Sequence, residues 1–193
     1  GVDQVKIYKF NDETGKITLM DMLRCELESA PRIIKFSPDG RFAYLICELK
    51  NYISVYTYKD GPRGPVFELV QTISTLNEYH SKGSAACVLR FSRDWNYVLC
   101  SNAGDNSVGI FKIDRETGML EKICILPVSG DYPKAADFFP DNRHIMALNH
   151  ESNTMTIFHI NYEKKYFSLW GKPLKVETPN CILVSEIEEA PKQ

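Results

Sequence analysis

The sequence lacks the features that mark membrane and nucleic-acid-binding proteins. It has no apolar run near the roughly 18 residues that a membrane-spanning helix needs, and no block of basic residues. The formal net charge is −2, from 23 Lys and Arg against 25 Asp and Glu. The N-terminal residues Gly1–Gln4 do not have the pattern of a signal peptide. We therefore expect neither a membrane nor a nucleic acid as partner.

The sequence also lacks the spacings of common metal-binding and serine-hydrolase sites. Its six cysteines include no Cys-x-x-Cys pair, its four histidines share no spacing, and no Gly-x-Ser-x-Gly motif is present. Five cysteines lie inside apolar, strand-like runs: Cys47, Cys87, Cys100, Cys124 and Cys181. Because cysteines in such runs behave as small buried hydrophobes, we expect free thiols, no zinc site and a cytoplasmic protein.

What the sequence does contain is a long-range repeat. The segment Phe36-Ser37-Pro38-Asp39-Gly40-Arg41 recurs 55 residues later from Phe91, and a further 47 residues on from Phe138. A second apolar run recurs in step, beginning at Val5, Ile53, Ser107 and Met155. Self-similarity at a period of about 50 residues predicts an array of similar structural units.

Each repeat contains four short strand-like runs. In the first complete repeat they span Arg32–Phe36, Phe42–Cys47, Ile53–Tyr58 and Phe67–Ile73. The runs are rich in Val, Ile, Tyr and Phe, and Asp, Gly, Asn and Pro separate them. Units of four strands and about 45–50 residues are typical of propeller blades, so we predict an all-β propeller of four-stranded antiparallel blades. An all-β sandwich would lack the long-range period.

The number of repeats does not close a ring. Residues 1–28 hold the last two strands of one blade, residues 29–76, 77–129 and 130–178 hold complete blades, and residues 179–187 hold a lone first strand. A ring closed by this chain alone would contain a three-stranded blade. Seven blades of about 48 residues need roughly 340 residues. We therefore expect the C-terminal half of a longer propeller, whose open edges are covered by the missing blades or by a second chain.

Aligned repeats point to one end of the blades as a binding site. The residue just after Pro at the start of the first strand is Arg32, Lys134 or Asn180, with Cys87 at this position in the remaining repeat. The residue at the end of the second strand is Glu48, Ala103 or His150. First strands of a propeller line its central channel. We therefore expect Arg32, Glu48, Lys134 and His150 to converge on one funnel, where binding groups tend to lie.

These residue types suit the attack of water on an electrophilic carbonyl group. Such a reaction requires a general base and a donor for the developing oxyanion. Glu48 can be the catalytic base, and Arg32 can orient the substrate or stabilise the oxyanion. Lys134 and Arg90 can bind a phosphate or carboxylate, with His150 beside them. A structural salt bridge between blades is the alternative role for Arg32 and Glu48.

On these residues the chain resembles the lactonase family of seven-bladed β-propellers, which includes bacterial 6-phosphogluconolactonase and fungal carboxymuconate lactonizing enzyme. The resemblance is carried by Pro31-Arg32, Phe36–Tyr44, Glu48-Leu49, Gln71–Leu76 and Ser101–Val108. It covers nearly the whole chain, in register with the C-terminal half of the family. It implies a small-molecule lactone or carboxylate as substrate, 6-phospho-D-glucono-1,5-lactone first, and no metal or cofactor.

The resemblance also implies which residues are catalytic, and it shows two departures. In the fungal enzyme an Arg and a Glu of one blade are implicated in catalysis, and Arg32 and Glu48 match them in motif and separation. Relatives read Asn-Arg-Gly and Pro-Arg where this chain has Ala103 and Lys134, and the family's functional His lies N-terminal to this chain. Three functions follow: a sugar-acid lactonase, a muconate-type cycloisomerase, or a propeller that binds a ligand or protein without turnover.

Overall fold

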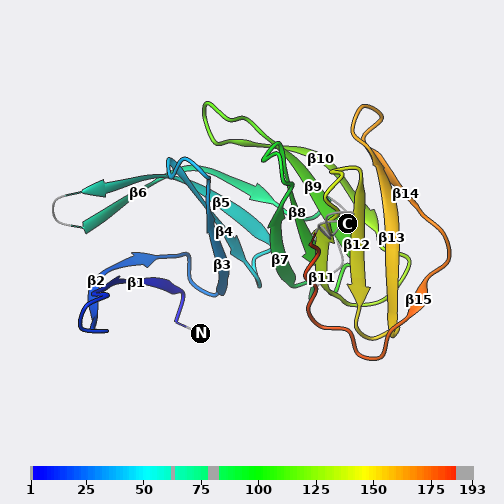
Figure 1. Cartoon of the computed structure of the whole chain (residues 1–193), viewed down its shortest axis with the longest axis horizontal. Helices are drawn as coiled ribbons and strands as arrows, with labels where there is room; N and C mark the ends of the chain where they lie inside the picture. Colours follow the sequence, from blue (N-terminus) through cyan, green and yellow to red (C-terminus); the bar gives the residue numbers. More distant parts are fainter. Residues whose placement is uncertain (1, 62–63, 78–82, 186–193) are drawn as a thin grey trace, which may run out of the picture.

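The computed structural model describes residues 2–61, 64–77 and 83–185. Within these ranges the chain consists of β-strands and turns, and no helix is present. Four antiparallel sheets follow one another along the sequence and stand side by side along an arc (Figure 1). The prediction of an all-β propeller, present as about half of a ring, is confirmed.

The strands of each sheet are consecutive in the sequence. The first sheet is a hairpin of β1 (Gln4–Phe10) and β2 (Ile17–Arg24). The first blade contains β3 (Pro31–Phe36), β4 (Phe42–Cys47), β5 (Tyr52–Gly61) and β6 (Gly64–Ser74). The second blade contains β7 (Ala86–Phe91), β8 (Tyr97–Asn102), β9 (Ser107–Ile113) and β10 (Leu120–Pro127). The third blade contains β11 (Pro133–Phe138), β12 (His144–Asn149), β13 (Thr154–Asn161), β14 (Tyr166–Leu169) and the short β15 (Leu174–Lys175).

Each blade places its first strand on the inner side of the arc. The pairing order is β3-β4-β5-β6 in the first blade, and the other two blades repeat it. Figure 1 shows β3, β7 and β11 toward the concave side and β6, β10 and β14 toward the outside. The strands also fall within the ranges 29–76, 77–129 and 130–178 proposed for the blades; the exact residues that divide one blade from the next stay a prediction.

Both faces of the first blade are apolar because it packs between the β1–β2 hairpin and the second blade. In β4, Phe42, Tyr44 and Ile46 pack against the second blade, in one cluster with Val98 and Phe111. The alternate residues Ala43, Leu45 and Cys47 pack against the β1–β2 hairpin. All six residues of β4 are buried. This burial on both sides explains why the second strands read as continuous apolar runs rather than as alternating ones.

An Asp or Asn in the left-handed region stands before the β1–β2 hairpin and before the third strand of each blade. These residues are Asp3, Asn51, Asn106 and Asn153, with φ between 43° and 54°. Their main-chain oxygens accept hydrogen bonds at 2.9–3.0 Å from the N–H groups of Cys25, Thr75, Val128 and Val176, near the end of the fourth strand of the same blade. Asp and Asn tolerate this conformation better than other side chains.

The side chains of the same four residues bind the loop that leads into the next blade. Asp3 accepts hydrogen bonds from the N–H groups of Glu28 and Ala30, both at 2.9 Å. Asn51 Nδ2 donates to the carbonyl oxygen of Ser84, at 3.0 Å. Asn106 and Asn153 accept from the N–H groups of Tyr132 and Thr178, each at 2.8 Å. We call each of these turn residues, with its bonds to both segments, a clasp; four clasps join consecutive blades.

The C-terminal segment departs from the sequence-based expectation at Cys181. No strand is formed over residues 176–185, and residues 186 and 187 lie outside the described residues, so the lone first strand expected at 179–187 stays a prediction. Cys181 is exposed, unlike the buried Cys47, Cys87, Cys100 and Cys124. The physical reason is that no described strand lies beside this segment to bond its backbone, so its apolar residues have no sheet to pack in.

The ends of the arc expose apolar side chains. On the β1–β2 hairpin, six large hydrophobic residues are between 39% and 63% exposed: Tyr8, Phe10, Ile17, Leu19, Met20 and Met22. A monomeric protein rarely leaves such a contiguous patch open to solvent. The described residues contain no helix of the length and hydropathy needed to cross a membrane.

Candidate functional site

The predicted site residues of the first strands occupy β-bulges. In each blade the pairing of the first two strands skips one residue near the start of the first strand: Arg32 between Pro31 and Ile33, Cys87 between Ala86 and Val88, and Lys134 between Pro133 and Ala135. A bulge redirects a side chain away from its neighbours in the strand, and bulges are frequent beside active sites. The same backbone device therefore presents three different side chains at one end of the blades.

Arg32 joins its own blade to the next one. Its Nη1 donates to Glu48 Oε2 at 2.7 Å, and its Nε donates to the main-chain oxygen of Cys87 at 2.8 Å. Glu48 lies directly after β4, and its own main-chain oxygen accepts from the N–H of Ala86 at 3.0 Å. The predicted contact between Arg32 and Glu48 is thus present, and it lies next to the junction between the first and second blades.

The Arg32–Glu48 pair is open to solvent on one side. The side chains are 42% and 30% exposed. Burial alone would lower the pKa of the Arg32 guanidinium, but the hydrogen bond and the negative charge of Glu48 outweigh it, so the pKa lies above its ordinary value. An ion pair this exposed adds little to stability. Its exposure therefore favours a role in binding another molecule.

Lys134 and His150 form the equivalent pair of the third blade. Lys134 Nζ lies 3.4 Å from His150 Nε2, and His150 Nδ1 lies 3.2 Å from the main-chain oxygen of Pro179. Since the Pro179 oxygen can only accept, Nδ1 carries the proton and Nε2 is free to accept from Lys134. No carboxylate in the described ranges pairs with Lys134, so its positive charge is available to an anion.

Cys87 occupies the bulge of the second blade, between the two blades that carry these pairs. Burial raises the pKa of the Cys87 thiol, and the positive charges of Arg32 and Lys134 oppose that rise. The second blade carries small side chains here, Cys87 and the fully buried Ala103. Arg32 and Lys134 occupy the same register position in their blades, and Glu48 and His150 each follow a second strand. The convergence of these four residues on one funnel stays a prediction.

Arg90 lies apart from this group. Its Nε is 3.4 Å from Asp137 Oδ2 on β11, so it ties the second blade to the third. It is three residues beyond Cys87 on the same strand, a separation of about 10 Å. Burial raises the pKa of Asp137, and the Phe138 N–H and Arg90 oppose that rise. A direct contact between Arg90 and a substrate stays a prediction.

Sequence reasoning did not single out Tyr132. This residue comes before Pro133, has a φ of 58°, and is partly exposed. The Lys134 ammonium lies 5.8 Å from the centre of its ring. The signal available in the sequence was a change of residue type. Two residues before the bulged residue, the first and second blades carry Ala30 and Ala85, whereas the third blade carries this tyrosine.

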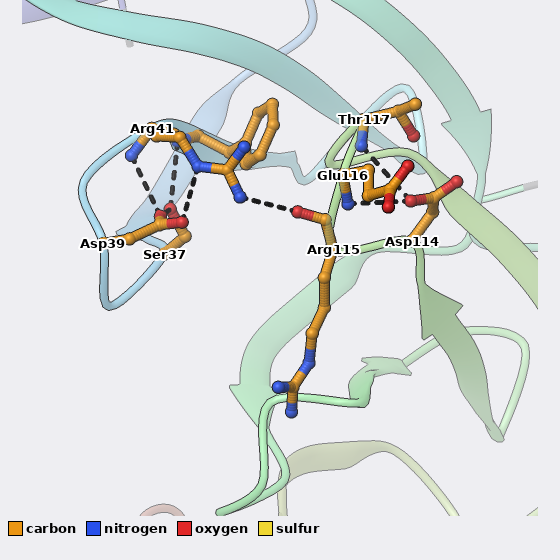
Figure 2. A network of polar contacts seen from close by, with 8 residues as sticks. Ser37, Asp39, Arg41, Asp114, Arg115, Glu116 and Thr117 are labelled. Atoms are coloured by element: carbon orange, nitrogen blue, oxygen red, sulfur yellow. Dashed lines mark hydrogen bonds and ion pairs between the residues drawn. The ribbon is translucent and has the colours of Figure 1, made fainter.

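A second polar cluster lies at the opposite end of the strands. Figure 2 shows Asp39, which bonds Ser37 Oγ at 2.6 Å and Arg41 Nε at 2.6 Å, while Arg41 Nη2 reaches the main-chain oxygen of Arg115 at 2.8 Å. These residues border a cleft of about 320 Å³ between the first two blades. The hydrogen bond from Arg41 to Arg115 joins a turn of the first blade to a turn of the second, so the cluster stabilises the contact between these two blades.

The described residues contain no group of three or more His, Cys, Asp or Glu side chains placed to hold a metal ion. The candidate site is therefore defined by Arg32, Glu48, Cys87, Tyr132, Lys134 and His150. It offers one carboxylate, two cations and a phenol, and this combination suits an anionic molecule with an electrophilic carbonyl.

Comparison with known proteins agrees with the fold. A family model described as "Lactonase, 7-bladed beta-propeller" matches residues 1–184. Among curated proteins, an uncharacterized protein of Lactococcus lactis subsp. cremoris is 30% identical over 183 residues, which cover 95% of this chain and 53% of that protein. The 6-phosphogluconolactonase of Bacillus subtilis is 24% identical over 182 residues, which cover 94% of this chain and 51% of that protein.

Solved structures show the same architecture. The periplasmic gluconolactonase of Pseudomonas aeruginosa superposes with a TM-score of 0.83 at 24% identity, over 93% of this chain and 50% of that one. The chain spans about half the length of the relatives it matches.

Proposed function

Since the chain belongs to the lactonase family of seven-bladed β-propellers, we propose that the full-length protein hydrolyses the lactone of a sugar acid. The observation that carries the proposal is the Glu48–Arg32 pair, 2.7 Å apart on a bulge at the open end of the blades, with Lys134 at the equivalent bulge of the third blade. A 6-phosphogluconolactone-like substrate fits this charge pattern, because Lys134 provides a cation for an anionic substituent.

The proposed reaction uses Glu48 as a general base. Glu48 removes a proton from a water molecule as the water oxygen attacks the lactone carbonyl carbon. Arg32 stabilises the negative charge that develops on the carbonyl oxygen. When the tetrahedral intermediate collapses, the bond from the carbonyl carbon to the ring oxygen breaks, and protonated Glu48 returns its proton to that oxygen. One water is consumed and one hydroxy acid is formed.

The test compares two substitutions with a matched control in the full-length protein. Glu48→Gln keeps the size of the side chain and removes the base, so we expect the enzymatic opening of 6-phospho-D-glucono-1,5-lactone to slow by about 10²–10⁴-fold. Arg32→Lys loses the fork that reaches Cys87 and Glu48 together, and it should also slow the reaction. Glu26→Gln removes an exposed carboxylate of the Lys50 ion pair, 57% exposed, and should leave the rate unchanged.

The rates are measured after subtraction of spontaneous hydrolysis, with D-glucono-1,5-lactone in parallel. Equal rates for wild type and Glu48→Gln would show that the proposed site is wrong. Failure of the wild type to open either lactone would show that the proposed substrate class, the lactones of sugar acids, is wrong.

A second function is supported by one specific observation. At the paired position of the second blade, Cys87 and Ala103 carry no charge, and Ala103 is fully buried. A propeller that binds an anionic ligand without turnover would need Arg32 and Lys134 and no further partner at this position. Binding of 6-phosphogluconate without lactone hydrolysis would support this second function.

A further inference from the structure

Tyr132 has an unusual backbone for a bulky side chain. Its φ of 58° lies in the left-handed region, which is unfavourable for residues other than Gly, Asn and Asp. The same conformation occurs at the equivalent residues Ala30 and Thr178, with φ of 51° and 42°. The equivalent Ala85 of the second blade does not have a positive φ, so the conformation occurs at the three positions that precede a proline. Among these positions only the third blade carries a large aromatic side chain.

The fold does not require the tyrosine side chain. The N–H of Tyr132 donates to Asn106 Oδ1 at 2.8 Å, and its carbonyl oxygen accepts from the N–H of His150 at 3.0 Å. Both bonds come from the backbone and would be kept by a glycine, which adopts this conformation at lower cost. A more costly residue at such a position suggests a use for its side chain.

The ring of Tyr132 lies beside a cation of the candidate site. Lys134 Nζ is 5.8 Å from the ring centre, and the Tyr132 side chain is partly exposed. Cys87 and Ala103 are small and buried, so the Tyr132 ring offers the largest apolar surface of the candidate site to a molecule bound at Lys134.

We propose that Tyr132 contacts the substrate and determines specificity: its ring packs against the C–H face of a sugar-acid ring and holds Lys134 beside an anionic substituent. This inference rests on the proposed function. Aromatic rings bury apolar C–H surface while a hydroxyl or a nearby cation binds polar groups. Lactones with both a saturated ring and an anionic group should therefore be preferred to neutral ones.

The experiment measures binding and stability of Tyr132→Gly and Tyr132→Phe in the full-length protein. The probes are the unreactive products 6-phosphogluconate and gluconate, titrated calorimetrically. Tyr132→Gly should bind 6-phosphogluconate roughly tenfold more weakly and prefer it less over gluconate, while its thermal midpoint is unchanged or raised. Tyr132→Phe keeps the ring and should stay within about threefold of wild type.

The matched control is Trp95→Gly. Trp95 is also an aromatic residue in the left-handed region, with φ of 55°, but it lies in the turn at the opposite end of the strands. It should change stability without changing affinity or preference. Wild-type binding by Tyr132→Gly, with lactone opening intact in the wild type, would overturn the role of Tyr132 alone. Absence of both binding and turnover in the wild type would overturn the proposed function together with this inference.

Discussion

Equivalent residues of successive blades give one backbone position several chemistries. The bulge of the first blade presents Arg32 beside Glu48, that of the second presents Cys87 beside Ala103, and that of the third presents Lys134 beside His150. The three pairs differ in chemistry: the first is a charged pair, the second is a small neutral pair, and the third is a cation beside an imidazole. The small pair makes room for the guanidinium of Arg32 on the Cys87 carbonyl, so each pair is best understood with its neighbours.

Asp137 gives a residue-scale prediction on pH. Burial raises its pKa above the ordinary 3.8 despite the Phe138 N–H and Arg90. At a pH between the ordinary pKa and the raised pKa of the folded protein, the folded state holds more protons than the unfolded state. The free energy of unfolding therefore falls as pH rises from about 4. Asp137→Asn should make this decline shallower. Urea unfolding at several pH values between 4 and 7 measures it.

Asp39 provides the control of opposite sign. Hydrogen bonds from Ser37 and Arg41 lower its pKa, so its contribution is present above pH 4 and is lost as pH falls further. Asp39→Asn should therefore lose stability relative to wild type near neutral pH and approach it in acid. If Asp137→Asn showed the same pH slope as wild type, burial of that carboxyl would not govern its titration.

At the scale of elements, the turn between β9 and β10 packs against the neighbouring blade through Gly118. Its φ is 73°, and a Cβ there would lie 2.4 Å from Phe42 Cδ1, an atom of a buried ring. Gly118→Ala should lower the free energy of unfolding by about 2 kcal/mol or more, because strain and overpacking add. Gly40 has a φ of 69° and nothing within 4 Å of its Cβ position, so Gly40→Ala should cost only about 1 kcal/mol.

Chemical denaturation of both variants tests the comparison, since they share the backbone strain and differ in the contact with Phe42. Equal losses would mean that Phe42 moves aside without cost, and that the packing between the first two blades is looser than the structure indicates.

Strand positions were predictable where a turn motif and an apolar run agree. Ser37-Pro38-Asp39-Gly40 set the end of β3 and the start of β4, and β4 begins and ends where predicted. The outer strands were placed less well: β6 runs from Gly64 to Ser74, whereas the sequence indicated Phe67–Ile73. Outer strands are half exposed, so their polar ends carry no apolar signal.

The candidate site was predictable in part for a similar reason. Repeat alignment found Arg32, Glu48, Lys134 and His150, because each occupies the same register position in its blade. It could not find Tyr132, whose place depends on contacts with Asn106 and His150, or the bond of Arg32 to the Cys87 carbonyl. Contacts between blades join residues about 50 positions apart, and a one-dimensional pattern does not specify them.

At the scale of the whole molecule, the exposed apolar residues of the β1–β2 hairpin are suited to packing against a further sheet. Leu23 packs toward the first blade, so Met22 points away from it by strand alternation. We expect further blades of the full-length protein to cover Met22, which is 39% exposed here. Met22→Lys should then destabilise the full-length protein by about 1 kcal/mol or more, and leave residues 1–193 alone unaffected.

Met119 is the matched control, because it is 40% exposed and lies on the turn between β9 and β10. Met119→Lys should be neutral in both proteins. Thermal unfolding of the four variants distinguishes the cases, and a neutral Met22→Lys in the full-length protein would show that the hairpin face stays open to solvent.

The clasps have a consequence for how such a protein can change in length. Each blade brings its own Asp or Asn in the turn after the second strand, and each blade offers, in the loop that precedes it, the backbone groups that the previous residue binds. The turn residue and the loop backbone groups that such a residue binds are therefore both encoded in every repeat. Duplication or loss of a whole unit therefore leaves every remaining joint matched, so the number of units can drift in evolution while the joint itself is inherited unchanged.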